Sequence, residues 1–183
     1  MNPEASADTE RSTVGRLVAG LARRLHDPEF PTGDHAALKR LSTERTELRH
    51  AVALYRLIEE VGISASDADG LRRWAAIVNA LALCRGAHDP NRPCGAALAA
   101  IRFSEERLAT LLTADRETLV DLLPRIARRL AAANEPMDWR PFARLVLDVG
   151  RNEARADDTR SRIAREYVRA ERQAPNLNSE TTA

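Results

Sequence analysis

The sequence predicts an all-α protein of two tandem helical bundles, and three observations support this prediction. Apolar residues recur at spacings of three and four along most of the chain, and the first such series is Val14, Leu17, Val18, Leu21 and Leu25. No segment shows the alternation of apolar and polar residues that is typical of a half-buried strand. The helical pattern is interrupted most clearly at residues 86–95, which contain two prolines and two glycines. The boundary between the two bundles is therefore expected in this segment.

The N-terminal bundle is expected at residues 13–88, after a disordered N-terminus at residues 1–12. Its helices are predicted at residues 14–26, 34–41, 43–61 and 69–85. Thr13 is the expected N-cap of the first helix, and Asp34 is that of the second. Gly62 is expected to end the third helix in the left-handed conformation. The inward face predicted for that helix is Leu48, Ala51, Tyr55 and Ile58, widened by Leu54 and Val61.

The C-terminal bundle is expected at residues 89–172, followed by a disordered tail at residues 173–183. Three of its helices are predicted at residues 96–101, 139–149 and 157–172. Two more are expected between the first two of these, one that begins after the N-cap Ser104 and one that carries the apolar stripe 119–130. Pro124 lies inside the stripe and is expected to kink that helix or to start a new one. Asp138 is the expected N-cap of the next helix. The aromatic residues expected in the core are Trp74, Trp139 and Phe142.

The composition is typical of a soluble globular protein. The 183 residues are 44% hydrophobic and 30% charged, with no run near the ~20 apolar residues that a membrane span requires. The polar and acidic N-terminus differs from the basic and apolar start of a signal peptide. Cys84 and Cys94 are too few for a disulfide framework, so we expect free thiols and a cytoplasmic location without membrane partners.

Motifs of the common enzyme and metal classes are absent from the sequence. It contains no Gly-rich phosphate loop, no nucleophile elbow, no HExxH and no EF-hand loop. Glu47 and His50 have the spacing of half a di-iron site, but no second pair follows, so we place both on solvated helix surface. Cys84, His88 and Cys94 could supply three zinc ligands, although a fourth is missing nearby. We therefore predict no catalytic residue, no metal site and no cofactor.

The kind of positive charge is more informative than the net charge of +1. Lys39 is the only lysine among the 28 Lys and Arg residues. An arginine fork pairs with phosphate through two parallel hydrogen bonds, and its plane stacks on bases. The basic residues form local clusters, including the stripe Arg162, Arg165, Arg169 and Arg172. Each cluster is compatible with a solvated helix face, and local sequence does not decide whether the clusters converge into a groove for a nucleic-acid backbone.

Several stretches, taken in order, resemble the CasB family, the small subunit of the type I-E CRISPR Cascade complex. They are GDHAALKRL (33–41), ELRHAVALYRLI (47–58), CGAALAAIRFSEERLATLLTADR (94–116) and MDWRPFARLVLD (137–148). The segment RSRIAREYVRA (160–170) is similar to the family's closing basic helix with its aromatic pair. The sequence departs from the family pattern at Ile163 and Val168, which replace aromatic residues, and at Lys39, which begins a pair that is Arg-Arg in the family.

This resemblance implies a non-enzymatic protein of two helical bundles, with two copies packed head to tail in a crRNA-guided complex. The partners implied are crRNA, target DNA, the other Cascade subunits and a second copy of this chain. The family's basic surface holds DNA strands of the R-loop, including the displaced strand. Residues that match the family's basic positions are Lys39, Arg40, Arg102, Arg107, Arg128, Arg129 and Arg144.

Three other functions remain open from the sequence. A helical scaffold would use the same arginines to meet acidic protein surfaces without binding nucleic acid. A helix-turn-helix regulator needs a tight turn before its recognition helix, whereas the loops here are long or rich in proline. A helical hydrolase would turn over nucleic acid or nucleotides with a divalent metal ion.

Overall fold

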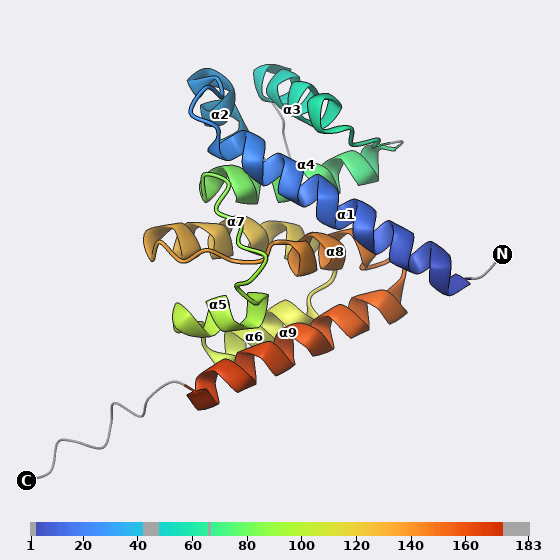
Figure 1. Ribbon diagram of the computed structural model, residues 1–183, viewed down its shortest axis with the longest axis vertical. Coiled ribbons are helices and arrows are strands. Elements are labelled where there is room, and N and C mark those ends of the chain that lie inside the picture. Colours follow the sequence, from blue (N-terminus) through green and yellow to red (C-terminus); the bar gives the residue numbers. More distant parts are fainter. Residues whose placement is uncertain (1–2, 42–47, 66, 174–183) are drawn as a thin grey trace, which may run out of the picture.

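The computed structural model describes residues 3–41, 48–65 and 67–173, and this part of the chain is all-α, as predicted (Figure 1). Its helices are α1 (Pro3–His26), α2 (Thr32–Lys39), α3 (Leu48–Val61), α4 (Ala68–Leu83), α5 (Cys94–Ala100), α6 (Glu105–Thr113), α7 (Arg116–Ala132), α8 (Arg140–Asp148) and α9 (Glu153–Gln173). No strand occurs in the described ranges, where an isolated β-bridge pairs His88 with Met137. None of the described helices is long and apolar enough to cross a membrane.

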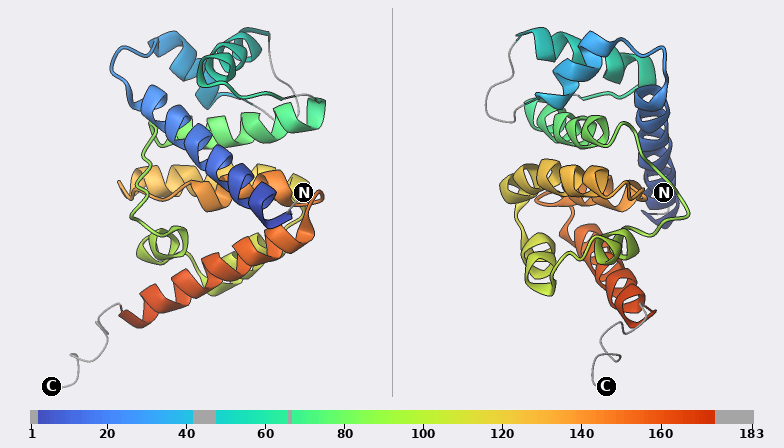
Figure 2. Two further views of the ribbon diagram at one scale, coloured as in Figure 1. Left: turned by 45° about the vertical axis from the view of Figure 1, so that its right-hand side comes forward. Right: turned by 90° about the vertical axis from the view of Figure 1, so that its left-hand side faces the viewer.

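The helices form stacked layers (Figures 1 and 2). α2 and α3 lie at one end of the molecule, where α2 contacts α4 and α3 contacts α1. α7 and α8 form the middle, and α5, α6 and α9 lie at the other end. Because α4 packs on α7 and α8 packs on both α1 and α9, helices from the two halves of the sequence share contacts in the middle of the molecule.

One connected set of buried apolar side chains runs through these layers. It contains Leu81 of α4, Leu123 of α7 and the pair Trp139 and Phe142, whose ring centroids are 6.0 Å apart. The prediction that Trp74, Trp139 and Phe142 belong to the core is confirmed. Complete burial of one such side chain contributes about 1.5–3 kcal/mol to stability. The division into bundles at residues 13–88 and 89–172 stays a prediction, since the core continues across it.

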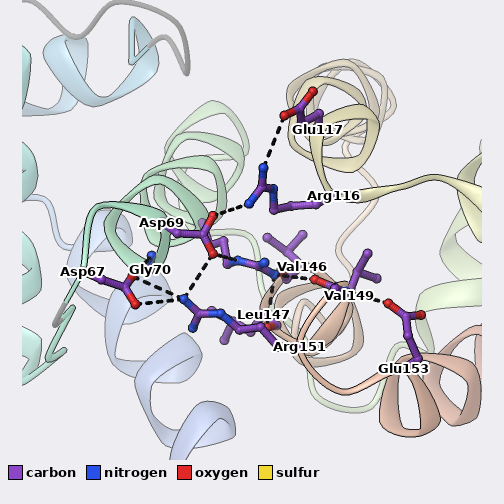
Figure 3. Close-up of polar contacts among 12 residues, drawn as sticks. Asp67, Asp69, Gly70, Arg116, Glu117, Val146, Leu147, Val149, Arg151 and Glu153 are labelled. Carbon is purple, nitrogen blue, oxygen red and sulfur yellow. Dashed lines mark hydrogen bonds and ion pairs between the residues drawn. The ribbon is translucent and has the colours of Figure 1, made fainter.

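A cluster of charged side chains ties α4 to the C-terminal half (Figure 3). Asp69 of α4 accepts hydrogen bonds from Arg73 Nε at 2.8 Å, from Arg116 Nη1 at 2.8 Å and from Arg151 Nη2 at 3.1 Å. Arg116 begins α7 and Arg151 lies in the turn between α8 and α9. Burial opposes ionisation of Asp69, but the hydrogen bond from Arg73 and the charges of the three arginines hold the pKa of this carboxyl below its usual value.

Arg73 extends the same cluster into the end of α8. Its side chain is 3% exposed, and its Nη1 donates to the carbonyl oxygens of Val146 at 2.5 Å and Val149 at 2.8 Å. The last carbonyls of a helix have no partner within the helix. A buried guanidinium from α4 therefore satisfies the C-terminal end of α8 (Figure 3).

Several predicted helix starts are wrong. α1 begins at Pro3, so residues 3–12, expected to be disordered, are helical, and Thr13 lies inside the helix rather than at its N-cap. Helices accept proline, alanine and glutamate in their first turns, and the apolar stripe from which this helix was predicted begins only at Val14. Three other helices begin before their predicted starts, namely α2 at Thr32, α5 at Cys94 and α9 at Glu153. In α2 the N-cap position is held by Pro31 rather than by Asp34.

Other predicted boundaries are confirmed. Ser104 caps α6 by accepting a hydrogen bond from Arg107 N at 3.4 Å, and Gly62 ends α3 with φ 79°. α7 continues through Pro124, which therefore starts no new helix. The predicted N-cap of α8 is wrong, because Trp139 rather than Asp138 holds that position and makes no capping bond through its side chain, although Asp138 Oδ1 accepts from Arg140 N at 3.0 Å. The predicted helix start at residues 43–47 and the tail residues 174–183 lie outside the described residues.

The buried face of α3 differs from the predicted one. Tyr55, expected inside, is 50% exposed, whereas His50, expected on solvated surface, is 5% exposed. Among residues 50–61 of this helix the buried ones are His50, Ala53, Leu54, Leu57 and Ile58, whereas the side chain of Leu48 lies outside the described part. Their spacing of three and four is also helical, so the sequence contained two overlapping stripes. Contacts of α3 with α1 and α2 decide between the two stripes.

Candidate nucleic-acid interface

Hydrogen bonds between elements bring together four parts of the chain that carry basic residues. The contributing elements are the C-terminal ends of α2, α4 and α5 and the second half of α7. Three hydrogen bonds from side chains to backbone carbonyls hold these elements together, and each is made next to basic residues.

The first contact holds the end of α2 against α4. Asn79 Nδ2 of α4 donates a hydrogen bond of 2.8 Å to the carbonyl oxygen of Leu38, the residue before Lys39 and Arg40. Leu41 then lines a groove of ≈ 250 Å³ together with Asn79 and with Arg128 of α7. Lys39 and Arg40 lie in the chain between Leu38, which Asn79 binds, and Leu41, which lines this groove together with Arg125 and Arg128.

The second contact fixes the position of Arg85, which is not among the binding residues predicted from the sequence. Cys84 Sγ donates to the carbonyl oxygen of Ala127 at 3.1 Å, so the residue after Cys84 lies near the residue after Ala127, which is Arg128. Burial and the positive charges of Lys39 and Arg85 together lower the pKa of His35. Arg85 thus lies close enough to His35 to act on it together with Lys39, and it directly follows Cys84, which is bonded to α7.

The third contact joins α7 to the turn after α5. Arg129 Nη2 donates to the carbonyl oxygens of Ile101 at 3.1 Å and Arg102 at 3.4 Å. The guanidinium carbon of Arg129 lies 5.5 Å from the ring centroid of Phe103, which is a cation–π contact. Arg129 is therefore engaged within the protein, and its bonds hold the backbone of the turn that contains Arg102 against the end of α7. The exposed side chain of Arg102 lines a cleft between α5, α6 and α9, together with Glu105 and Glu171.

We call Lys39, Arg40, Arg85, Arg102 and Arg128 the basic face. None of these five residues forms an ion pair with a carboxylate in the part of the chain that the structure describes. Elsewhere many arginines are paired, as in Arg24–Glu60 at 2.7 Å and Arg140–Asp138 at 2.8 Å. Positive charge on this side is therefore left for an external partner, which is the arrangement that attracts a polyanion.

The remaining two predicted binding residues lie differently. Arg107 is exposed in the first turn of α6, which follows the turn that contains Arg102. Arg144 lines a separate cleft of ≈ 540 Å³ between α1, α8 and α9, with Arg155 and Arg162. The beginning of α9 lies at the opposite side of the molecule from the ends of α4 and α7 (Figure 1). Arg144 is thus not part of the basic face.

The residues considered as zinc ligands in the sequence, Cys84, His88 and Cys94, make contacts within the fold. Burial raises the pKa of Cys84 to about 12 and that of Cys94 well above its usual value, so both free thiols stay protonated. His88 Nδ1 accepts a hydrogen bond from Trp139 N at 3.2 Å. No group of three His, Cys, Asp or Glu side chains in the described ranges is placed to hold a metal ion. Glu47 lies outside those ranges.

Comparison with known proteins gives one match. The family model described as CRISPR-associated protein Cse2 matches residues 34–167, a range that contains all seven predicted binding residues. Neither the curated proteins nor the solved structures contain a match to the chain. The matched range covers well over half of the 183 residues. The chain therefore belongs to the Cse2 family, the non-catalytic small subunit of the type I-E CRISPR Cascade complex.

Proposed function

We propose that this Cascade subunit binds the nucleic-acid backbone through the basic face and thereby stabilises the R-loop, including the displaced strand. One observation carries the proposal: five basic residues from four elements gather without carboxylate partners among the described residues. Two copies of the chain, together with the other Cascade subunits and crRNA, would present this face to target DNA in the cytoplasm.

The physical requirements on such a subunit are modest. In RNA-guided complexes sequence is read by base pairing with the guide, so a subunit that holds strands needs only to recognise phosphates. Arginines that contact phosphate give sequence-independent and salt-sensitive binding. The basic face consists of four arginines and Lys39, which suits that task because arginine forks match phosphate geometry.

The test uses the assembled complex with one reversed charge. Arg128→Glu should reduce the reactivity of unpaired thymines in the displaced strand towards permanganate, since a less stable R-loop closes more often. The matched control is Arg16→Glu, which reverses an exposed charge on α1. Both variants should co-purify with crRNA and the other subunits.

Other outcomes identify the alternatives. If Arg128→Glu abolished assembly while the free protein still bound DNA as tightly as wild type, the helical scaffold would replace our proposal. Sequence-selective binding of duplex DNA by the isolated protein would support a helix-turn-helix regulator. Turnover of nucleic acid with a divalent metal ion would support a hydrolase.

A further inference from the structure

Four helices of this protein end in the same hydrogen-bonded turn. In α3, α4, α5 and α7 the chain beyond the helix donates back to carbonyls of the last turn in the pattern of a Schellman motif. The closing bonds run from Ile63 N to Ile58 O at 2.8 Å, Gly86 N to Leu81 O at 2.8 Å, Phe103 N to Leu98 O at 3.1 Å and Glu135 N to Leu130 O at 3.0 Å. This motif places the residue after the C-cap in the left-handed conformation, and those residues are Gly62, Arg85, Arg102 and Asn134, with φ of 79°, 52°, 52° and 50°. At the end of α4 the next residue, Gly86, also has a positive φ, of 71°.

Two of the four residues are unusual for this position. Glycine adopts the left-handed conformation without strain, and asparagine tolerates it because its short side chain bonds locally. Gly62 and Asn134 follow this rule, whereas Arg85 and Arg102 do not. In the left-handed conformation the Cβ of any residue other than glycine lies close to the following carbonyl oxygen, so the fold alone would favour glycine at both arginine positions.

The side chains of Arg85 and Arg102 make no contact with the described part of the chain that would compensate for the backbone strain. Neither guanidinium forms a hydrogen bond or an ion pair with a described residue, and both residues are exposed. The backbone of Arg85 does contact the protein, because its carbonyl oxygen lies 3.3 Å from His26 Nδ1. The carbonyl oxygen of Arg102 likewise accepts from Arg129 Nη2 at 3.4 Å. Glycine would retain both backbone contacts.

Both strained arginines belong to the basic face. Backbone strain that persists without an internal partner is characteristic of functional positions. We propose that Arg85 and Arg102 are retained in left-handed conformations because their guanidinium groups bind phosphates of the bound strand, and that Arg85 bridges the contacts made by Lys39 and Arg128. This inference rests on the proposed function and adds Arg85 to the binding residues.

A structural explanation makes the opposite prediction for stability. Positive charge at the C-terminal end of a helix interacts favourably with the helix dipole. If this interaction were the reason for the two arginines, their replacement by glycine would lower the melting temperature. If phosphate binding is the reason, the same replacement removes strain that the free protein does not need.

The experiment therefore measures stability and binding on the same variants. Arg85→Gly and Arg102→Gly should each raise the melting temperature by about 2–4 °C. Each should also weaken binding of the full chain to a fluorescent single-stranded oligonucleotide by roughly 3- to 10-fold. Arg85→Asn, which removes the charge without adding glycine flexibility, should weaken binding equally.

The control is Asn134→Gly, which changes the same position of the same motif at an uncharged residue. It should leave oligonucleotide binding unchanged. A lower melting temperature in Arg85→Gly and Arg102→Gly would overturn the inference, as would wild-type binding by these variants. If Arg128→Gln weakened binding while all variants at residues 85 and 102 bound like wild type, only this inference would fail. If the wild-type protein and its assembled complex did not bind DNA through this face at all, the proposed function would fail with it.

Discussion

Arg129 of α7 donates a hydrogen bond of 3.1 Å to the carbonyl oxygen of Ile101, the residue that follows α5. This contact joins the middle layer to the end layer and leaves the neighbouring residue Arg128 exposed beside α4. Two adjacent arginines on one helix therefore have different roles. Arg129 holds the fold together, whereas Arg128 belongs to the basic face.

Removing the Arg129 side chain should lower stability, whereas removing that of Arg128 should not. Arg129→Met loses the bonds to two carbonyls and the cation–π contact with Phe103, a loss of about 1–3 kcal/mol. Arg128→Met changes an exposed side chain and should stay within about 0.5 kcal/mol of wild type. Urea unfolding measures both free energies. Equal losses in the two variants would contradict this assignment.

Arg73 should be far more important for stability than its neighbour Arg72. Arg73→Met leaves the carbonyls at the end of α8 and the Asp69 carboxylate without their buried partner, which costs about 3–5 kcal/mol. Arg72 is exposed, so Arg72→Met is the matched control and should have little effect on the unfolding free energy. The result would contradict the account if Arg73→Met unfolded at the same urea concentration as Arg72→Met.

The close approach of α5 to α9 depends on Gly95. A Cβ added there would lie 2.3 Å from the carbonyl oxygen of Ile163 and 2.4 Å from the amide nitrogen of Tyr167. Since backbone cannot move away cheaply, Gly95→Ala should destabilise the protein by about 1–3 kcal/mol or more. Gly33→Ala is the control, because a Cβ at that helical position meets open space and should stabilise the protein by about 0.4–1 kcal/mol. Thermal unfolding that ranks the two variants in the reverse order would refute the packing of α5 on α9.

Stability should fall as the pH drops below the usual histidine pKa. Burial lowers the pKa of His88 despite the opposing charge of Asp138, and burial with nearby positive charges lowers that of His35. The unfolded chain therefore binds protons at these histidines at a pH where the folded protein does not, so unfolding is favoured from about pH 6.5 downwards. Urea unfolding between pH 7 and pH 5 measures the effect. The slope should become shallower in His88→Asn, and an unchanged slope would exclude His88 as a contributor.

The sequence predicts most of the helices because the core stripes have a clear helical period, as in the segments that became α4 and α7. It does not predict the first turns of α1, which precede the apolar stripe, or the choice between the two stripes of α3, since neither follows from local pattern. Four of the seven predicted binding residues lie on the basic face, namely Lys39, Arg40, Arg102 and Arg128. Arg85 was missed because its place follows from the contacts of Cys84 and His35, and its only local signal is an arginine at the left-handed position before Gly86.

The salt dependence of single-stranded DNA binding tests the phosphate-binding role of the basic face most directly. Each neutralised phosphate contributes about 0.7 to the slope of log affinity against log salt concentration, so Lys39→Gln combined with Arg128→Gln should flatten the slope by about 1.4. The same loss of charge at Arg16 and Arg72, both exposed on other parts of α1 and α4, should leave the slope at its wild-type value. An unchanged slope in the Lys39 and Arg128 variant, or equal flattening in both double variants, would contradict the account.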